Sequence, residues 1–110
     1  MSGWSRGRLA SGDDAPVQGE RIERILERDG VVIEQILSSD AVEPVTYDQD
    51  HDEWVVVLGG SAAIQIEGED DVEEVWLDGG DWLFLPARVR HKVVHTTSGT
   101  SWLAVHLPSK

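Results

Sequence analysis

Side chains that could do chemistry gather in two short stretches of this 110-residue chain. The first is 47–53, which reads Tyr-Asp-Gln-Asp-His-Asp-Glu, and the second is 86–91, with His95 a little beyond it. Alternate residues of a strand share one face. If the first stretch is extended, its odd-numbered side chains line one side of the chain: Tyr47, Gln49, His51 and Glu53. A shared site then requires His91 from the second stretch to lie opposite them.

Two kinds of chemistry suit a carboxylate and an imidazole that converge in this way. Together with a side-chain amide or a second His, they can hold a divalent ion such as Zn, Fe, Mn or Ni. The amide of Gln49 would be a weak oxygen donor in such a site. Without a metal, Glu53 and His91 could act as general base and general acid, in either order. The residues alone leave both alternatives open.

Short apolar runs between glycine-rich turns predict that strands position these side chains. Asp29-Gly30 separates the apolar-rich runs 21–26 and 31–37, and Asp-Gly is typical of a tight hairpin. Further strands are predicted at 54–58, 61–67, 72–77, 82–85, 89–96 and 102–107. Trp54, Trp76, Trp82 and Trp102 fall within them, where packing is their expected role. Such closely spaced strands, without a long helical pattern, predict an all-β sandwich or barrel.

Length and charge limit the classes of function. The length fits one domain, with a flexible N-terminal arm over 1–19, rich in Gly, Ser, Asp and Arg, and a β-barrel over 20–110. Acidic residues outnumber Lys plus Arg by 21 to 9, and the formal net charge of −12 disfavours nucleic-acid and anionic-membrane partners. The sequence has no Cys, no apolar run that suits a membrane helix and no secretory signal in its first ten residues. A cytoplasmic protein is therefore expected.

The spacing of several residues resembles that of the cupin superfamily over nearly everything beyond the arm. The family's first motif is G-x5-H-x-H-x3-E-x6-G, and Glu53 and Gly60 match its end. Its second motif is G-x5-P-x-G-x2-H-x3-N, which Gly80, Pro86 and His91 match. The resemblance implies a single-domain jelly-roll barrel, also called a double-stranded β-helix, with a pocket in its mouth.

Carried over residue by residue, the resemblance reproduces only part of the family's metal site. In the family, two leading His, the Glu and the later His bind the metal, and the leading positions hold Tyr47 and Gln49 here. The implied metal set is therefore Gln49, Glu53 and His91. Tyr47 would join it only as a phenolate, and His51, which falls in the motif's variable gap, only through a local bulge.

Three further side chains are candidates for the wall or rim of the pocket. Arg88 stands where the second motif has Gly, and beside His91 it could attract an anionic ligand. His95 stands where that motif has Asn, and strand alternation puts it on the face of His91. His106 lies in the last predicted strand, and the sequence leaves open whether its face points into the barrel.

The resemblance implies an enzyme that acts on a small polar metabolite as a dioxygenase, isomerase, epimerase or lyase. Glu53 and His91 would be its catalytic residues, and a divalent Fe, Mn, Zn or Ni ion its cofactor. The alternative is a metal-free module that binds a small molecule in the same pocket without catalysis, since a retired metal site would lack two His. A purely structural role would require a filled interior. Family members commonly dimerise, so a homodimer is expected beside a small-molecule ligand.

Overall fold

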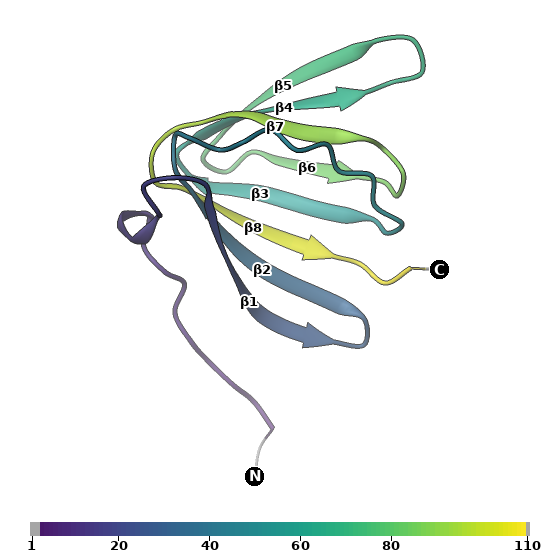
Figure 1. Cartoon of the computed structure of the whole chain (residues 1–110). Coiled ribbons are helices and arrows are strands. Elements are labelled where there is room, and N and C mark those ends of the chain that lie inside the picture. The colour runs from purple at the N-terminus through teal and green to yellow at the C-terminus, as the bar shows by residue number, and fades with distance from the viewer. Residues whose placement is uncertain (1–2, 110) are drawn as a thin grey trace.

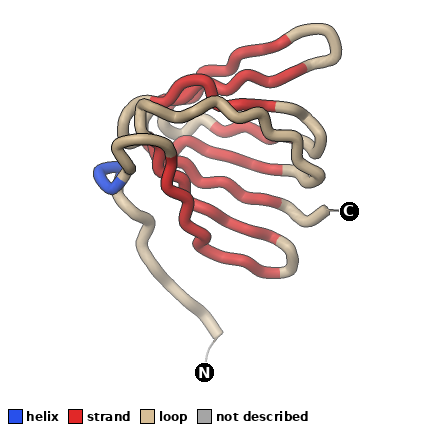
Figure 2. Tube along the Cα trace, in the orientation of Figure 1, coloured by secondary structure: helices blue, strands red, loops and turns tan. Residues whose placement is uncertain are grey.

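The computed structural model describes residues 3–109, which form eight strands and one short 3-10 turn, η1 (Gly12–Asp14). The strands are β1 (Glu20–Arg28), β2 (Val31–Ser38), β3 (Glu53–Gly59), β4 (Ser61–Glu67), β5 (Val72–Asp78), β6 (Trp82–Leu85), β7 (His91–Thr96) and β8 (Thr100–His106) (Figure 2). The predicted all-β architecture is confirmed. Within residues 3–109, no helix has the length and apolar character needed to cross a membrane.

The strands form two antiparallel sheets. The larger has the order β1-β2-β8-β3-β6, and the smaller has the order β5-β4-β7 (Figure 1). The last strand, β8, lies between β2 and β3, and β7 pairs with β4, so the chain crosses repeatedly between the two layers. This is the jelly-roll topology that the sequence predicts. Apolar side chains of both sheets form its core: Val55, Val57, Ala62, Ile64, Leu77, Leu85, Trp102 and Ala104.

A tight hairpin joins β1 to β2 at Asp29 and Gly30, as predicted. Both residues have positive φ, 53° and 82°. Two consecutive residues of this kind make the turn that matches the twist of neighbouring antiparallel strands. The hairpin matters for the site because it carries two acidic side chains, Glu20 and Glu34, to the inner face of the larger sheet.

Part of the N-terminal segment is held against the larger sheet. The amide of the buried Gln35 donates to the carbonyl of Ala10 at 2.9 Å and accepts from the Ala10 N–H at 2.8 Å. Before Ala10 the chain runs away from the sheets (Figure 1). The flexibility of the arm stays a prediction. Residues 1–2 of the arm and residue 110 of the barrel lie outside the described residues.

The outer face of the larger sheet carries a continuous apolar row across all five strands. Strand pairing places these side chains side by side: Leu26, Ile33, Val105, Trp54 and Phe84. Leu26 and Phe84 are exposed. An exposed apolar patch of this kind is typical of a contact surface. The predicted homodimer stays a prediction.

Candidate functional site

A cavity of about 120 Å³ lies between the two sheets. Ile36, Ile64, Val93 and Trp102 belong to its apolar wall. Its polar side chains are Glu20, Glu34, Tyr47, Gln49, Glu53, His91 and His106. A mostly apolar wall with a few converging polar groups is the usual composition of a small-molecule site.

Glu53, the first residue of β3, and His91, the first residue of β7, meet inside this cavity. Both are buried, and Glu53 Oε1 lies 3.9 Å from His91 Nε2. The other ring nitrogen, Nδ1, lies 3.0 Å from the carbonyl oxygen of Val89. A carbonyl can only accept, so Nδ1 carries a hydrogen and Nε2 is the atom that faces Glu53. A separation of 3.9 Å is too long for a direct hydrogen bond, so a ligand atom can interact with both groups.

Gln49 and Tyr47 complete this part of the wall. Gln49 Nε2 donates to Glu53 Oε1 at 2.9 Å and so fixes the carboxylate. Tyr47 and His91 exchange two backbone hydrogen bonds of 2.8 and 3.1 Å, and their rings stack with centroids 5.6 Å apart. Burial, followed by the nearby carboxylates of Glu20 and Glu53, raises the pKa of the Tyr47 phenol. The phenol is therefore a neutral hydrogen-bonding group in the metal-free cavity.

The metal site implied by the resemblance can be tested against these donors. Of the four corresponding positions, only Glu53 and His91 supply strong donors. The Gln49 amide directs its nitrogen toward Glu53, and an amide nitrogen has no lone pair to give. Within residues 3–109, no group of three or more His, Asp or Glu side chains could hold one ion. The side chains around Glu53 therefore supply only part of the donor set that the family motif implies.

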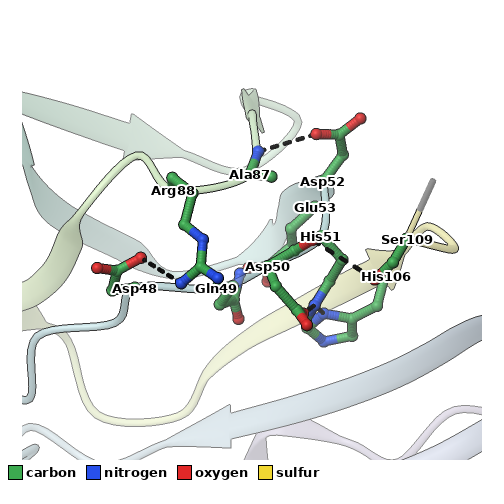
Figure 3. A network of polar contacts seen from close by, with 10 residues as sticks. All are labelled: Asp48, Gln49, Asp50, His51, Asp52, Glu53, Ala87, Arg88, His106 and Ser109. Atoms are coloured by element: carbon green, nitrogen blue, oxygen red, sulfur yellow. Dashed lines mark hydrogen bonds and ion pairs between the residues drawn. The ribbon is translucent and has the colours of Figure 1, made fainter.

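His51 does not line this cavity, contrary to the sequence prediction. The chain bends at Asp50 and His51, which breaks the extended alternation and turns His51 toward β8. His51 Nε2 lies 2.9 Å from His106 Nδ1 (Figure 3). On the other side of the His106 ring, Nε2 lies 2.8 Å from Glu34 Oε1. His51 Nδ1 lies 3.2 Å from Asp50 Oδ1, and this hydrogen bond is the main cause that lowers the pKa of Asp50. His106 itself lines the cavity, so the open question about its face is answered.

The loop that carries Gln49 and His51 is fastened to the turn before β7. The backbone N–H of Ala87 donates to the carboxylate of Asp52 at 2.8 Å (Figure 3). The backbone N–H of Arg88 donates to the carbonyl of Gln49 at 2.7 Å. The Arg88 guanidinium lies 3.4 Å from Asp48. These contacts join the two segments that the sequence analysis singled out.

Arg88 is not among the residues that line the cavity, and its predicted role at the rim stays a prediction. It is exposed and its φ is 69°. The position where the family motif has Gly therefore keeps the left-handed backbone that favours Gly, although Arg occupies it. The tight turn directs the side chain to solvent beside Asp48.

Replacing Arg88 with Gly is expected to stabilise the protein by about 0.5–1 kcal/mol. A left-handed non-Gly residue costs roughly 1–2 kcal/mol, which the greater freedom of Gly in the unfolded chain offsets in part. The exposed ion pair with Asp48 contributes little. Urea unfolding measures the change. Arg90→Gly is the control, since Arg90 is also exposed but its φ is not positive, and it should destabilise the strand entry. A loss of stability in both variants would contradict the strain at Arg88.

His95 is also outside the cavity, and its prediction as a pocket residue is wrong. In the β4–β7 register, Ile64 pairs with Val93 but Ala63 pairs with His95, so β7 holds one extra residue at that point. This bulge inverts the alternation and places His95 on the outer face. There its ring lies 5.4 Å from that of Trp76, centroid to centroid.

Glu20 and Glu34 are cavity residues that the sequence analysis missed. They come from β1 and β2, whose inward faces also carry Ile22 and Ile36. The sequence signal for an inward position was that each Glu lies two residues before an isoleucine of the same strand face, Ile22 or Ile36. It stayed ambiguous because β1 carries charged residues on both of its faces, and β2 has Glu34 as its single charged residue.

Comparison with protein-family models and with curated protein sequences finds no match. Solved structures do match. A protein of Ralstonia eutropha JMP134, provisionally named a mannose-6-phosphate isomerase, is 37% identical, with a TM-score of 0.73 over 94% of this chain and 100% of that one. A cupin superfamily protein of Desulfitobacterium hafniense DCB-2 is 20% identical, with a TM-score of 0.75 over 96% and 94%. KdgF of a Halomonas species is 16% identical, with a TM-score of 0.73 over 84% and 82%. The first is a relative in sequence, and the other two share the fold.

Proposed function

The chain belongs to the cupin superfamily, and from that premise we propose that it is a proton-transfer enzyme of the isomerase or epimerase type. Its substrate is a small neutral or cationic molecule with a carbonyl group, held in the cavity between the sheets. The observation that carries the proposal is the pair Glu53 and His91, buried and facing each other across 3.9 Å. In this arrangement the carboxylate can remove a proton from a bound substrate while the imidazole gives a proton to the same substrate.

The proposed reaction begins with removal of a proton from the carbon next to the carbonyl. Glu53, held by the Gln49 amide, takes this proton as general base. His91, in its protonated form, gives the hydrogen on Nε2 to the carbonyl oxygen, so that a neutral enediol or enol forms. Glu53 then returns its proton to the same carbon from the other side or to the neighbouring carbon, while His91 takes back a hydroxyl proton. The hydrogen bond from Nδ1 to Val89 holds the ring throughout.

The charge of the cavity supports a substrate without phosphate. Glu20, Glu34 and Glu53 line it, and its described lining contains no Lys or Arg. Phosphate recognition normally uses Arg, Lys or a helix N-terminus. The substrate therefore differs in charge from the one in the name of the R. eutropha protein. The volume of about 120 Å³ suits a molecule of three or four carbons.

The test is exchange of carbon-bound hydrogen for deuterium in D2O, followed by NMR. The probes are glyceraldehyde, dihydroxyacetone and erythrulose. The wild-type protein is expected to accelerate exchange next to the carbonyl. Glu53→Gln and His91→Gln should each lower the rate at least 100-fold, because general acid–base groups typically contribute about 10²–10⁴-fold. His95→Gln is the matched control and should exchange at the wild-type rate, since His95 lies on the outer face.

Two further results separate the alternatives. Glyceraldehyde 3-phosphate should exchange more slowly than glyceraldehyde, because three carboxylates face the ligand. Thermal stabilisation by these probes without any exchange would contradict the catalytic proposal and favour a binding module in the same cavity. Equal exchange in wild type and in Glu53→Gln would contradict the role of Glu53.

A further inference from the structure

A second feature lies beside the cavity, where four side chains make a row of three contacts. The order is Asp50, His51, His106 and Glu34, and Figure 3 shows the first three of them. His51 and His106, here called the histidine pair, form the middle contact, with 2.9 Å between His51 Nε2 and His106 Nδ1. Their side chains are 26% and 20% exposed, so the pair is reachable from solvent yet largely enclosed.

Two neutral imidazole rings supply two N–H groups in total, which is one fewer than the three contacts of this row require. Each outer contact joins a ring nitrogen to a carboxylate, which can only accept when ionised. A neutral imidazole has a single N–H. If each ring gives its N–H to its own carboxylate, the two inner nitrogens face each other with lone pairs. At 2.9 Å such lone pairs repel, so a positive species must lie at the middle contact, either an extra proton or a metal ion.

We propose that the histidine pair binds one divalent transition-metal ion, of the class of Zn²⁺, through His51 Nε2 and His106 Nδ1. Imidazole nitrogens suit these ions, with metal–nitrogen distances of about 2.0–2.1 Å. Two such nitrogens lie roughly 3.3 Å apart at the tetrahedral angle that zinc prefers, so the two rings would separate by a few tenths of an ångström from the 2.9 Å of the middle contact. Neither ring has to leave its carboxylate for this.

The carboxylates of Asp50 and Glu34 give the pair the surroundings of metal-binding histidines. Such histidines almost always donate their other N–H to a carboxylate or carbonyl, which orients the ring and makes the ligating nitrogen more basic. Here both rings have that partner, at 3.2 and 2.8 Å. The two negative charges also offset the charge of the ion.

The remaining coordination positions can be filled by water. The histidine pair and Glu34 line a second cavity of about 280 Å³, together with residues 107–109 near the end of the chain. The protein supplies two donors to this ion, which agrees with the lack of a three-donor group within residues 3–109. The site shares Glu34 and His106 with the wall of the first cavity but uses neither Glu53 nor His91 as a donor, so it does not depend on the proposed proton transfer.

The test is calorimetric titration of the untagged full chain with zinc chloride. Wild type is expected to bind one Zn²⁺ per chain. His51→Asn and His106→Asn should each weaken binding at least tenfold. His91→Asn and His95→Asn remove other imidazoles and should leave the affinity within twofold of wild type. Absence of zinc binding by wild type would overturn the proposal, as would a loss of binding confined to His91→Asn.

A more conservative variant keeps the zinc titration informative if one of the His→Asn variants does not fold. Glu34→Gln keeps the shape of the side chain but removes the carboxylate that orients His106, and changes of this kind typically cost about 10–100-fold in metal affinity. Thermal unfolding without zinc shows whether each variant is folded. If His106→Asn does not fold, His51→Asn and Glu34→Gln decide the question. Wild-type affinity in both of these would overturn the proposal.

Discussion

Replacing Trp102 with Ala is expected to lower the free energy of unfolding by about 3–5 kcal/mol, the usual range for a buried aromatic residue. Trp102 is 3% exposed, belongs to the apolar core and closes one wall of the cavity. Its indole N–H donates to the hydroxyl of Ser38 at 3.0 Å, and that hydroxyl donates to Glu20 at 3.0 Å. Alanine would therefore enlarge the cavity and leave the buried Ser38 oxygen without a donor.

Chemical denaturation measures the loss, which is a large fraction of the stability of a domain of this size. Trp82→Ala is the matched control. Trp82 is 59% exposed and contacts Trp54 at a centroid distance of 6.1 Å. About 1 kcal/mol or less is expected there, since one aromatic contact is lost without a cavity. Similar losses of stability in the two variants would contradict the role of Trp102 in the apolar core between the two sheets.

The strands and the jelly roll could be predicted from the sequence because their signals are local. Each strand is a short apolar run, and turn residues such as Asp29-Gly30 mark its ends. The motif spacing added what local signals cannot give, namely that Glu53 and His91 meet although β3 and β7 lie in different sheets. The proximity of Glu53 and His91 is therefore the part of the candidate site that the motif spacing predicted.

The other site residues depend on backbone irregularities that the alternation of side chains does not encode. His51 leaves the cavity at a bend, and His95 leaves it at a bulge. One displaced residue is enough in each case, because a shift of one position moves a side chain to the other face. Sequence periodicity assumes a regular strand, so it assigned both residues to the wrong side.

Glu20 and Glu34 were missed for a different reason. Their place in the cavity follows from the pairing of the β1–β2 hairpin with β8, a strand more than sixty residues away in sequence from Glu34. With Glu53 they make the cavity acidic, which is the basis for a substrate without phosphate. The same Glu34 also orients His106. One strand thus connects the charge of the cavity with the histidine pair, and changes at Glu34 should alter both.

Replacing Gly60 with Ala is expected to destabilise the protein by about 2–5 kcal/mol. Its φ is 88°, where a non-Gly residue costs roughly 1–2 kcal/mol. An added Cβ would also lie 2.4 Å from the Oγ1 of Thr100 and 2.8 Å from its Cα. Thr100 is fully buried, and its hydroxyl bonds to the carbonyls of Ser61 and Thr97, so it cannot move aside. Overpacking of this kind typically adds about 1–3 kcal/mol.

Two other glycines separate the backbone strain from the clash. Gly80 has φ 94° with no atom within 4 Å of an added Cβ, so Gly80→Ala should show the strain alone, roughly 1–2 kcal/mol. Gly59 has open space and no positive φ, so Gly59→Ala should be neutral or slightly stabilising. The three variants are compared by urea unfolding. The difference between Gly60→Ala and Gly80→Ala then measures the contact of Gly60 with Thr100, and equal losses in these two would mean that β8 does not approach the β3–β4 turn as closely as described.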